Sequence, residues 1–135
     1  MEREDLGALL AQLMRRVMEA ERPILDAQGL SMWGYAVLSR LADQPIQTQQ
    51  ALAKAIGYDK SRLIPLLDTL EQDGLLTRQP DPTDRRAHTI ALTPEGTARL
   101  KATKSAIHTM EEDLLAPLTA SQKQTLFIAL SRLKP

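Results

Sequence analysis

Two groups of basic side chains are the residues of this sequence best suited to do chemistry. Arg85 and Arg86 end the run Asp-Pro-Thr-Asp-Arg-Arg, and Lys60 and Arg62 flank Ser61. Arginine presents a planar fork of donors that matches phosphates and guanine edges, and serine hydrogen-bonds to several bases. The residue types therefore predict noncovalent binding of a nucleic acid. The alternative is that both groups are solvated surface charges, because short motifs often match by chance.

Catalysis and metal binding have little support in the sequence. There is no cysteine, which removes disulfides, thiolate nucleophiles and thiol-based redox sensing. The two histidines, His88 and His108, are not spaced i, i+4 and have no cysteine partner, so a structural metal site is not expected. Combined with Asp84 and Glu95, they show no nucleophile–base spacing. We expect no enzyme, no metal and no cofactor.

Composition places the chain among ordinary globular proteins without deciding its partner. It has 135 residues, 43% hydrophobic and 25% charged, with 17 basic and 17 acidic side chains. Zero net charge counts against nucleic-acid binding, where a basic domain is usual. However, the position of the charges matters more than their sum. No apolar run approaches the roughly 20 residues that a membrane span needs, and the acidic N-terminus does not resemble a signal peptide. We expect a cytoplasmic location.

The arginine pair is expected at the tip of a projecting hairpin. Two strand-like runs, 75–78 and 88–92, flank it. Between them Pro80, Asp81 and Pro82 pull the chain out of regular structure. A surface hairpin whose arginines only maintain solubility would have the same pattern.

Six helices are expected around this hairpin, four before it and two after it. Apolar residues from Leu6 to Met18 recur at helical spacing and form one wide stripe. Capping residues and helix breakers define the remaining helices. The expected bounds are Leu6 to about Pro23, Ser31 to before Pro45, Thr48 to Gly57, Asp59 to Gly74, Thr93 to about Leu115, and a last helix opened by the Thr119–Gln122 capping box.

The third and fourth helices form a helix–turn–helix, since only Gly57 and Tyr58 separate them. The second helix of this motif lies in the major groove with its N-terminal residues against base edges. Lys60, Ser61 and Arg62 occupy that end; as solvated residues they would oppose the helix dipole. Pro65 removes one intrahelical hydrogen bond, which would either shape the groove-facing surface or be a tolerated irregularity. We add Gln49, in the preceding helix, to the expected DNA contacts.

Between about Leu30 and Leu133 the sequence resembles the MarR family of bacterial winged-helix regulators. The resemblance rests on the order and spacing of residues 48–53 before Gly57, 70–76, the run 81–86, and 92–96. It implies a homodimer in which the first helix and the last two helices intertwine. It also implies that Arg85 enters the minor groove, that Asp84 orients it through a salt bridge, and that Arg86 holds phosphate or the wing.

The expected fold is therefore mainly α with a small β-hairpin wing: a winged helix-turn-helix plus a helical dimerisation region. We expect an N-terminal dimerisation helix over 1–30, a DNA-binding region over 31–93 and C-terminal dimerisation helices over 94–135, all in one intertwined domain. The expected function is a transcriptional repressor that binds a pseudo-palindromic operator in double-stranded DNA. The alternative is a winged helix used for protein–protein contact, with little DNA affinity.

A small aromatic or anionic effector is a further expectation, because many relatives in the family respond to such ligands. Met14, Met18, Met32, Trp33 and Tyr35 could line a cleft for it, and methionine adapts to irregular pockets. The alternative is that these five side chains simply pack in the core, as apolar residues at helical spacing usually do.

Overall fold

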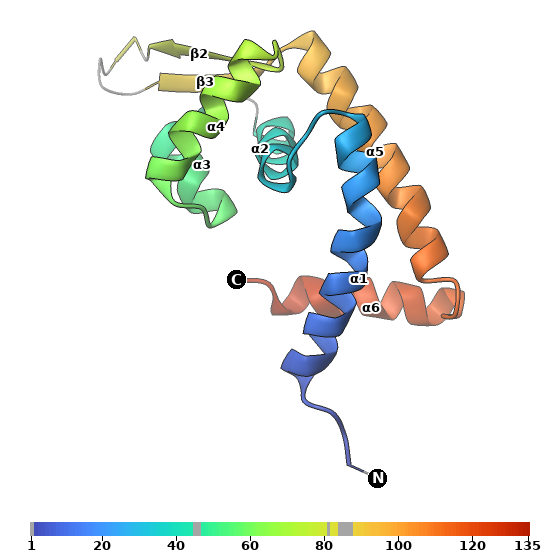
Figure 1. Cartoon of the computed structure of the whole chain (residues 1–135). Coiled ribbons are helices and arrows are strands. Elements are labelled where there is room, and N and C mark those ends of the chain that lie inside the picture. Colours follow the sequence, from blue (N-terminus) through green and yellow to red (C-terminus); the bar gives the residue numbers. More distant parts are fainter. Residues whose placement is uncertain (1, 45–46, 81, 84–87) are drawn as a thin grey trace.

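A computed structural model describes residues 2–44, 47–80, 82–83 and 88–135 (Figure 1). Helices make up most of the described chain, and a β-hairpin lies between the fourth and fifth helices in sequence. The elements are α1 Leu6–Ala27, α2 Met32–Asp43, β1 Gln47–Thr48, α3 Gln49–Ile56, α4 Lys60–Gln72, β2 Leu76–Pro80, β3 His88–Leu92, α5 Pro94–Leu114 and α6 Ala120–Leu133. The expected mainly helical fold with a hairpin wing is confirmed.

Side-chain caps begin four of the helices where the sequence placed them. The hydroxyl groups of Ser31, Thr48 and Thr93 accept hydrogen bonds from backbone N–H groups three residues later, at 3.0, 3.2 and 3.0 Å. Thr119 and Gln122 form the expected reciprocal capping box. Each cap satisfies an N–H group that has no partner inside the helix, which fixes the helix start.

Two expectations about helix ends are wrong. The first helix does not end near Pro23 but continues to Ala27. Proline removes a single intrahelical hydrogen bond, and the burial of Leu25 in the core holds the last turn in place. Asp59 is the N-cap of α4, but its side chain does not cap the helix; it accepts a hydrogen bond from the Ser61 hydroxyl instead.

The sheet contains one strand that was not expected. Its order is β1-β3-β2, with both pairs antiparallel. β1 consists of two residues paired with β3 in the register Gln47↔Ile90 and Thr48↔Thr89. A strand of two residues is too short to show a periodic pattern in the sequence. It is a strand only because it pairs with residues that lie 41 to 43 positions away in the chain. The wing pair β2–β3 has Arg78 opposite Ile90.

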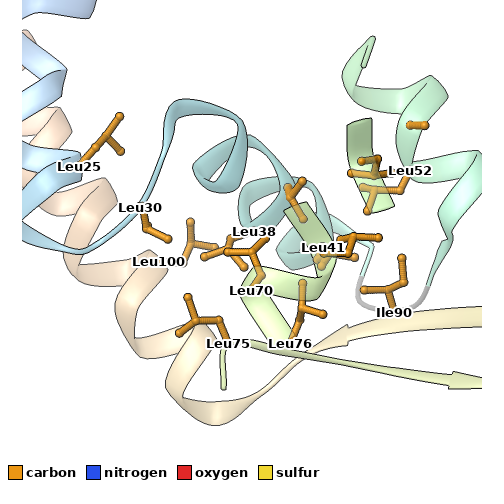
Figure 2. Packing of buried hydrophobic residues seen from close by; sticks show 14 of the residues in the cluster. Leu25, Leu30, Leu38, Leu41, Leu52, Leu70, Leu75, Leu76, Ile90 and Leu100 are labelled. Carbon is orange, nitrogen blue, oxygen red and sulfur yellow. The ribbon is translucent and has the colours of Figure 1, made fainter. Parts of the chain in front are cut away.

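The core lies under the helix–turn–helix and is built almost entirely from leucine. Figure 2 shows Leu38 and Leu41 of α2 surrounded by side chains from α4, β2, β3 and α5. Leu38, Leu41 and Ile90 have no exposed surface. Because α2 is enclosed by the other elements, it serves as the central support of the helix–turn–helix and the wing.

The first helix and the last two helices extend away from this core. Figure 1 shows α1 and α5 running together from the winged region, with α6 at the far end of α5. No residue of α6 is buried. None of the described helices is long and apolar enough to cross a membrane.

Candidate nucleic-acid interface

The turn between α3 and α4 is held in a fixed shape. Gly57 ends α3 in the left-handed region, at φ 68°, where a side chain would be strained. The next residue, Tyr58, stacks on Trp33 of α2 with 4.4 Å between ring centroids and 31° between the planes. The aromatic pair therefore fastens the turn to the central helix, and so sets the position of the first turn of α4.

The N-terminal turn of α4 presents three exposed polar side chains. Lys60, Ser61 and Arg62 are all exposed, whereas Leu63 and Leu67 on the opposite face are buried. Because the leucines fix the rotation of the helix, the three polar residues must face outward. In DNA-binding helix–turn–helix proteins, this end of the second helix meets base edges.

The electrostatics of this end favour an anion. The first turn of α4 contains no acidic residue, and the helix dipole adds a partial positive charge to those of Lys60 and Arg62. Asp59 lies beside them and accepts the Ser61 hydroxyl hydrogen bond. A phosphate placed here would meet positive charge and backbone N–H groups together.

Pro65 lies on the exposed face of α4, and the helix continues through it to Gln72. The Thr69 hydroxyl donates to the carbonyl oxygen of Pro65 at 3.2 Å. Proline cannot donate to the carbonyl of Ser61, so that oxygen loses its helical partner on the outward face. The structure thus places Pro65 on the same surface as Ser61 and Arg62.

Gln49 lies apart from that surface. It lines a groove of about 360 Å³ together with Ile64 of α4, Glu71 and Arg78. Its Oε1 atom is buried and has no hydrogen-bond partner within the described parts of the chain. Gln49 therefore lies at the groove between α3, α4 and the wing, with its amide oxygen shielded from solvent.

The wing tip is carried by β2 and β3, which project beyond α4 in Figure 1. Asp84, Arg85 and Arg86 lie outside the described residues, so their assigned roles stay predictions. Between the strands that lead to the tip, only Pro82 and Thr83 are described, and both are exposed. The outermost pair of the two strands is Pro80 opposite His88.

An ion-pair network joins the wing to α4, and sequence reasoning missed it. Arg78 of β2 forms salt bridges with Asp68 and with Glu71, the latter at 2.9 Å. The hydrogen bonds from Arg78 lower the pKa of Glu71 below its ordinary value. The available signal was the spacing: Arg78 lies two residues after the buried Leu76, and Asp68 and Glu71 lie on one side of a helix.

Two cavities lie along α1, away from the DNA-binding face. One of about 270 Å³ is bordered by α1 and the start of α2, and Met18 and Met32 line it together with Glu21 and Arg22. The other, of about 630 Å³, includes Met14 and Met18. Of the three methionines proposed for an effector pocket, Met18 lines both cavities, Met32 only the first and Met14 only the second.

The two aromatic residues proposed for the same pocket lie elsewhere. Trp33 stacks on Tyr58 and Tyr35 packs against the core, and neither lines these two cavities. Burial, followed by the negative charge of Glu111, raises the pKa of Glu21. Burial also raises the pKa of the Tyr35 hydroxyl, with smaller opposing and reinforcing effects from Ser39, Glu21 and Glu111. A partly buried polar cluster therefore lies between α1, α2 and α5.

Comparisons with known proteins agree on one class of protein, the transcriptional regulators. The model of the MarR family matches residues 30–88. A Thauera aromatica protein assigned as a transcriptional regulatory protein for the hcr operon is 33% identical over 112 residues, which are 83% of this chain and 68% of that protein.

Two solved structures are similar over nearly the whole chain. The transcriptional repressor CouR, bound to a 23-mer DNA duplex, is 28% identical with a TM-score of 0.87, covering 98% of this chain and 99% of its own. The regulator PcaV of Streptomyces coelicolor, in complex with its natural ligand, is 28% identical with a TM-score of 0.74, covering 98% and 96%.

Proposed function

Since the chain belongs to the MarR family of transcriptional regulators, we infer that it represses transcription by binding a pseudo-palindromic operator as a homodimer. The observation that carries this inference is the exposed turn Lys60–Arg62 at the free end of a recognition helix. The wing contacts the same helix through Arg78, Asp68 and Glu71. One protomer can therefore contact two adjacent grooves. The similarity to a DNA-bound repressor supports the same conclusion.

Each part of the chain has a separate task in this proposal. Residues 31–93 bind DNA, while 1–30 and 94–135 dimerise, and the three parts form one intertwined domain. We propose that Lys60, Ser61, Arg62 and Pro65 meet the major groove and that Gln49 contacts DNA from the groove between α3, α4 and the wing. Asp84, Arg85 and Arg86, which lie outside the described residues, are proposed to contact DNA at the wing tip, where arginine suits a narrow minor groove. We propose action in the cytoplasm, where the operator lies, and no enzymatic role.

Operator binding is tested by fluorescence anisotropy on the DNA upstream of the protein's own gene. The wild-type protein should protect half-sites about 10 bp apart, one helical turn. Arg62→Ala should relax the base preference by roughly 1–3 kcal/mol if Arg62 pairs with a guanine. Arg85→Ala should weaken binding across sequences without changing the fold.

Lys101→Ala serves as the matched control for the loss of one positive charge, because Lys101 is exposed on α5, a helix that carries none of the exposed large apolar side chains. Its operator affinity should equal that of the wild type. If Arg62→Ala and Arg85→Ala also bind as tightly as the wild type, the winged helix is a protein-contact module.

We propose further that a small aromatic or anionic effector binds along α1 and releases the DNA. Half of the residues that line the cavity between α1 and α2 are apolar, and its charged side chains are Arg22, Glu21 and Asp26. A ligand can release DNA only if it binds the DNA-incompetent conformation more tightly. Met32 lines this cavity and is followed directly by Trp33, whose ring contacts the helix–turn–helix.

A panel of aromatic acids and phenols should contain a compound that changes Trp33 fluorescence and lowers operator affinity together. Met32→Glu should weaken that response by about ten-fold or more, because it places a carboxylate against the ligand. The affinity for DNA without ligand should not change, since an acid in the first turn suits the helix dipole. Met32→Leu, which keeps the volume, should respond like the wild type. An unaltered response in Met32→Glu would exclude this cavity.

A further inference from the structure

Arg78 is the outermost side chain of β2 that is anchored to the rest of the protein. Side chains alternate across a strand, so Arg78 shares a face with Leu76, which is 1% exposed. Beyond Arg78, the strand residues Gln79 and Pro80 are exposed. On β3 the residue opposite Arg78 is the fully buried Ile90. Arg78 is therefore the last residue of β2 whose own side chain holds it to another described element, while β3 is held one residue further out, at Thr89, by its pairing with Thr48.

The acceptors of Arg78 lie on one side of the recognition helix. Its guanidinium donates to Glu71 Oε1 at 2.9 Å from Nη2 and at 3.3 Å from Nε, and Nη2 also donates to Asp68. The backbone N–H of Arg78 donates to Glu71 Oε2 at 3.0 Å. β2 is an edge strand of the described sheet, so this N–H points away from β3 and would otherwise have no partner in the sheet. Glu71 thus binds both the side chain and the edge of the strand.

This arrangement holds β2 against α4 more firmly than an ordinary surface ion pair would. An exposed pair contributes little because both side chains stay flexible. Here several donors of one residue converge on one carboxylate, and the Arg78 side chain is only 18% exposed. The hydrogen bonds from the side chain and backbone of Arg78 lower the pKa of Glu71, so the carboxylate stays charged at neutral pH.

We propose that Arg78 is a positioning residue for DNA recognition: it locks the wing to α4, so that the wing tip and the first turn of α4 engage their grooves together. The proposal rests on the proposed function. Lys60–Arg62 and the wing tip belong to different elements, and the clamp of Arg78, Asp68 and Glu71 is where β2 meets α4 through polar contacts. Arg78 acts through these carboxylates, not on the DNA itself.

Glu71→Gln tests the clamp, because a purely electrostatic effect and the loss of the clamp would change operator affinity in opposite directions. Removing a negative charge near DNA should by itself strengthen binding. If the clamp positions the wing, operator affinity should instead fall by about ten-fold, within the range that contacting residues show. Asp73→Asn is the matched control, since Asp73 is exposed at the end of the same helix. It should bind the operator as tightly as the wild type or slightly more tightly.

A double-mutant cycle completes the test. Arg78→Gln should weaken operator binding at least as much as Glu71→Gln does, because it removes the contacts with both Glu71 and Asp68. The double variant should be no weaker than Arg78→Gln, because the side-chain contact with Glu71 is already lost there. Circular dichroism confirms that each variant is folded, and if Arg78→Gln is not, Glu71→Gln against Asp73→Asn decides alone. A Glu71→Gln protein that binds as well as Asp73→Asn, or losses that add in the double variant, would overturn the clamp. Absence of binding by the wild type would overturn the proposed function instead.

Discussion

Replacing Gly96 with alanine is expected to cost about 3 kcal/mol or more of the free energy of unfolding. A Cβ atom added at Gly96 would lie 1.9 Å from the carbonyl oxygen of Leu75 and 2.9 Å from its carbonyl carbon. These are backbone atoms, which cannot turn aside as a side chain can. They are also held in place, because Thr93 donates to Leu75 O at 3.1 Å and to Gly74 O at 2.6 Å.

The sign of this effect makes the prediction specific. Gly96 lies in the first turn of α5, and glycine to alanine in a helix normally stabilises by up to about 1 kcal/mol. Gly7→Ala in α1 is the control, because nothing lies within 4 Å of the added atom. Urea unfolding should show Gly96→Ala much less stable and Gly7→Ala unchanged or slightly more stable. Equal stability of Gly96→Ala and the wild type would mean that α5 does not pack against Leu75 in this way.

The second large effect is expected from a charge on α6. Of the large apolar side chains that the structure describes as exposed, nine lie on α1 or α6 and only Met32 and Ile64 lie elsewhere. Phe127, for example, is 51% exposed. A soluble protein rarely leaves so much contiguous apolar surface in water, and a second copy of the same face would cover it. The nine are Leu6, Leu9, Leu10, Met14, Met18, Phe127, Ile128, Leu130 and Leu133.

Light scattering of the wild-type protein should therefore give about twice the chain mass of 15.0 kDa. Phe127→Glu should shift the mass toward one chain, because it would bury an unpaired carboxylate in the interface. Its operator affinity should fall by about 10²-fold or more, since two linked half-site contacts become one. Ile64→Glu places the same charge on α4 and should keep the dimer mass. A monomeric wild type, or a dimeric Phe127→Glu protein with full affinity, would contradict this architecture.

Local sequence signals predicted the helix starts well. Ser31, Thr48, Thr93 and Thr119 cap helices as expected, and Gly57 ends α3 in the left-handed region. These features depend on atoms within three or four residues of one another, so the local sequence contains the necessary information. The same holds for the exposed turn of α4, because the spacing of its leucines fixes which residues face outward.

Features formed between distant segments could not be predicted in this way. The Trp33 ring is positioned by its contact with Tyr58, and residue 96 must be glycine because the backbone of Leu75 leaves no room for a Cβ atom. Arg78 is shielded from solvent by its contacts with α4. The strand β1 exists only because β3 lies beside it.

The sequence by itself therefore determined the six helices and the hairpin of this protein, their order, and the residues at the free end of the recognition helix. The tertiary structure decided that β1 joins the sheet, how the wing is fixed to that helix and where the cavities along α1 lie. The physical reason is one of range: capping and amphipathic spacing act within a helix turn. Close packing and converging hydrogen bonds, in contrast, join residues that only the folded chain brings together.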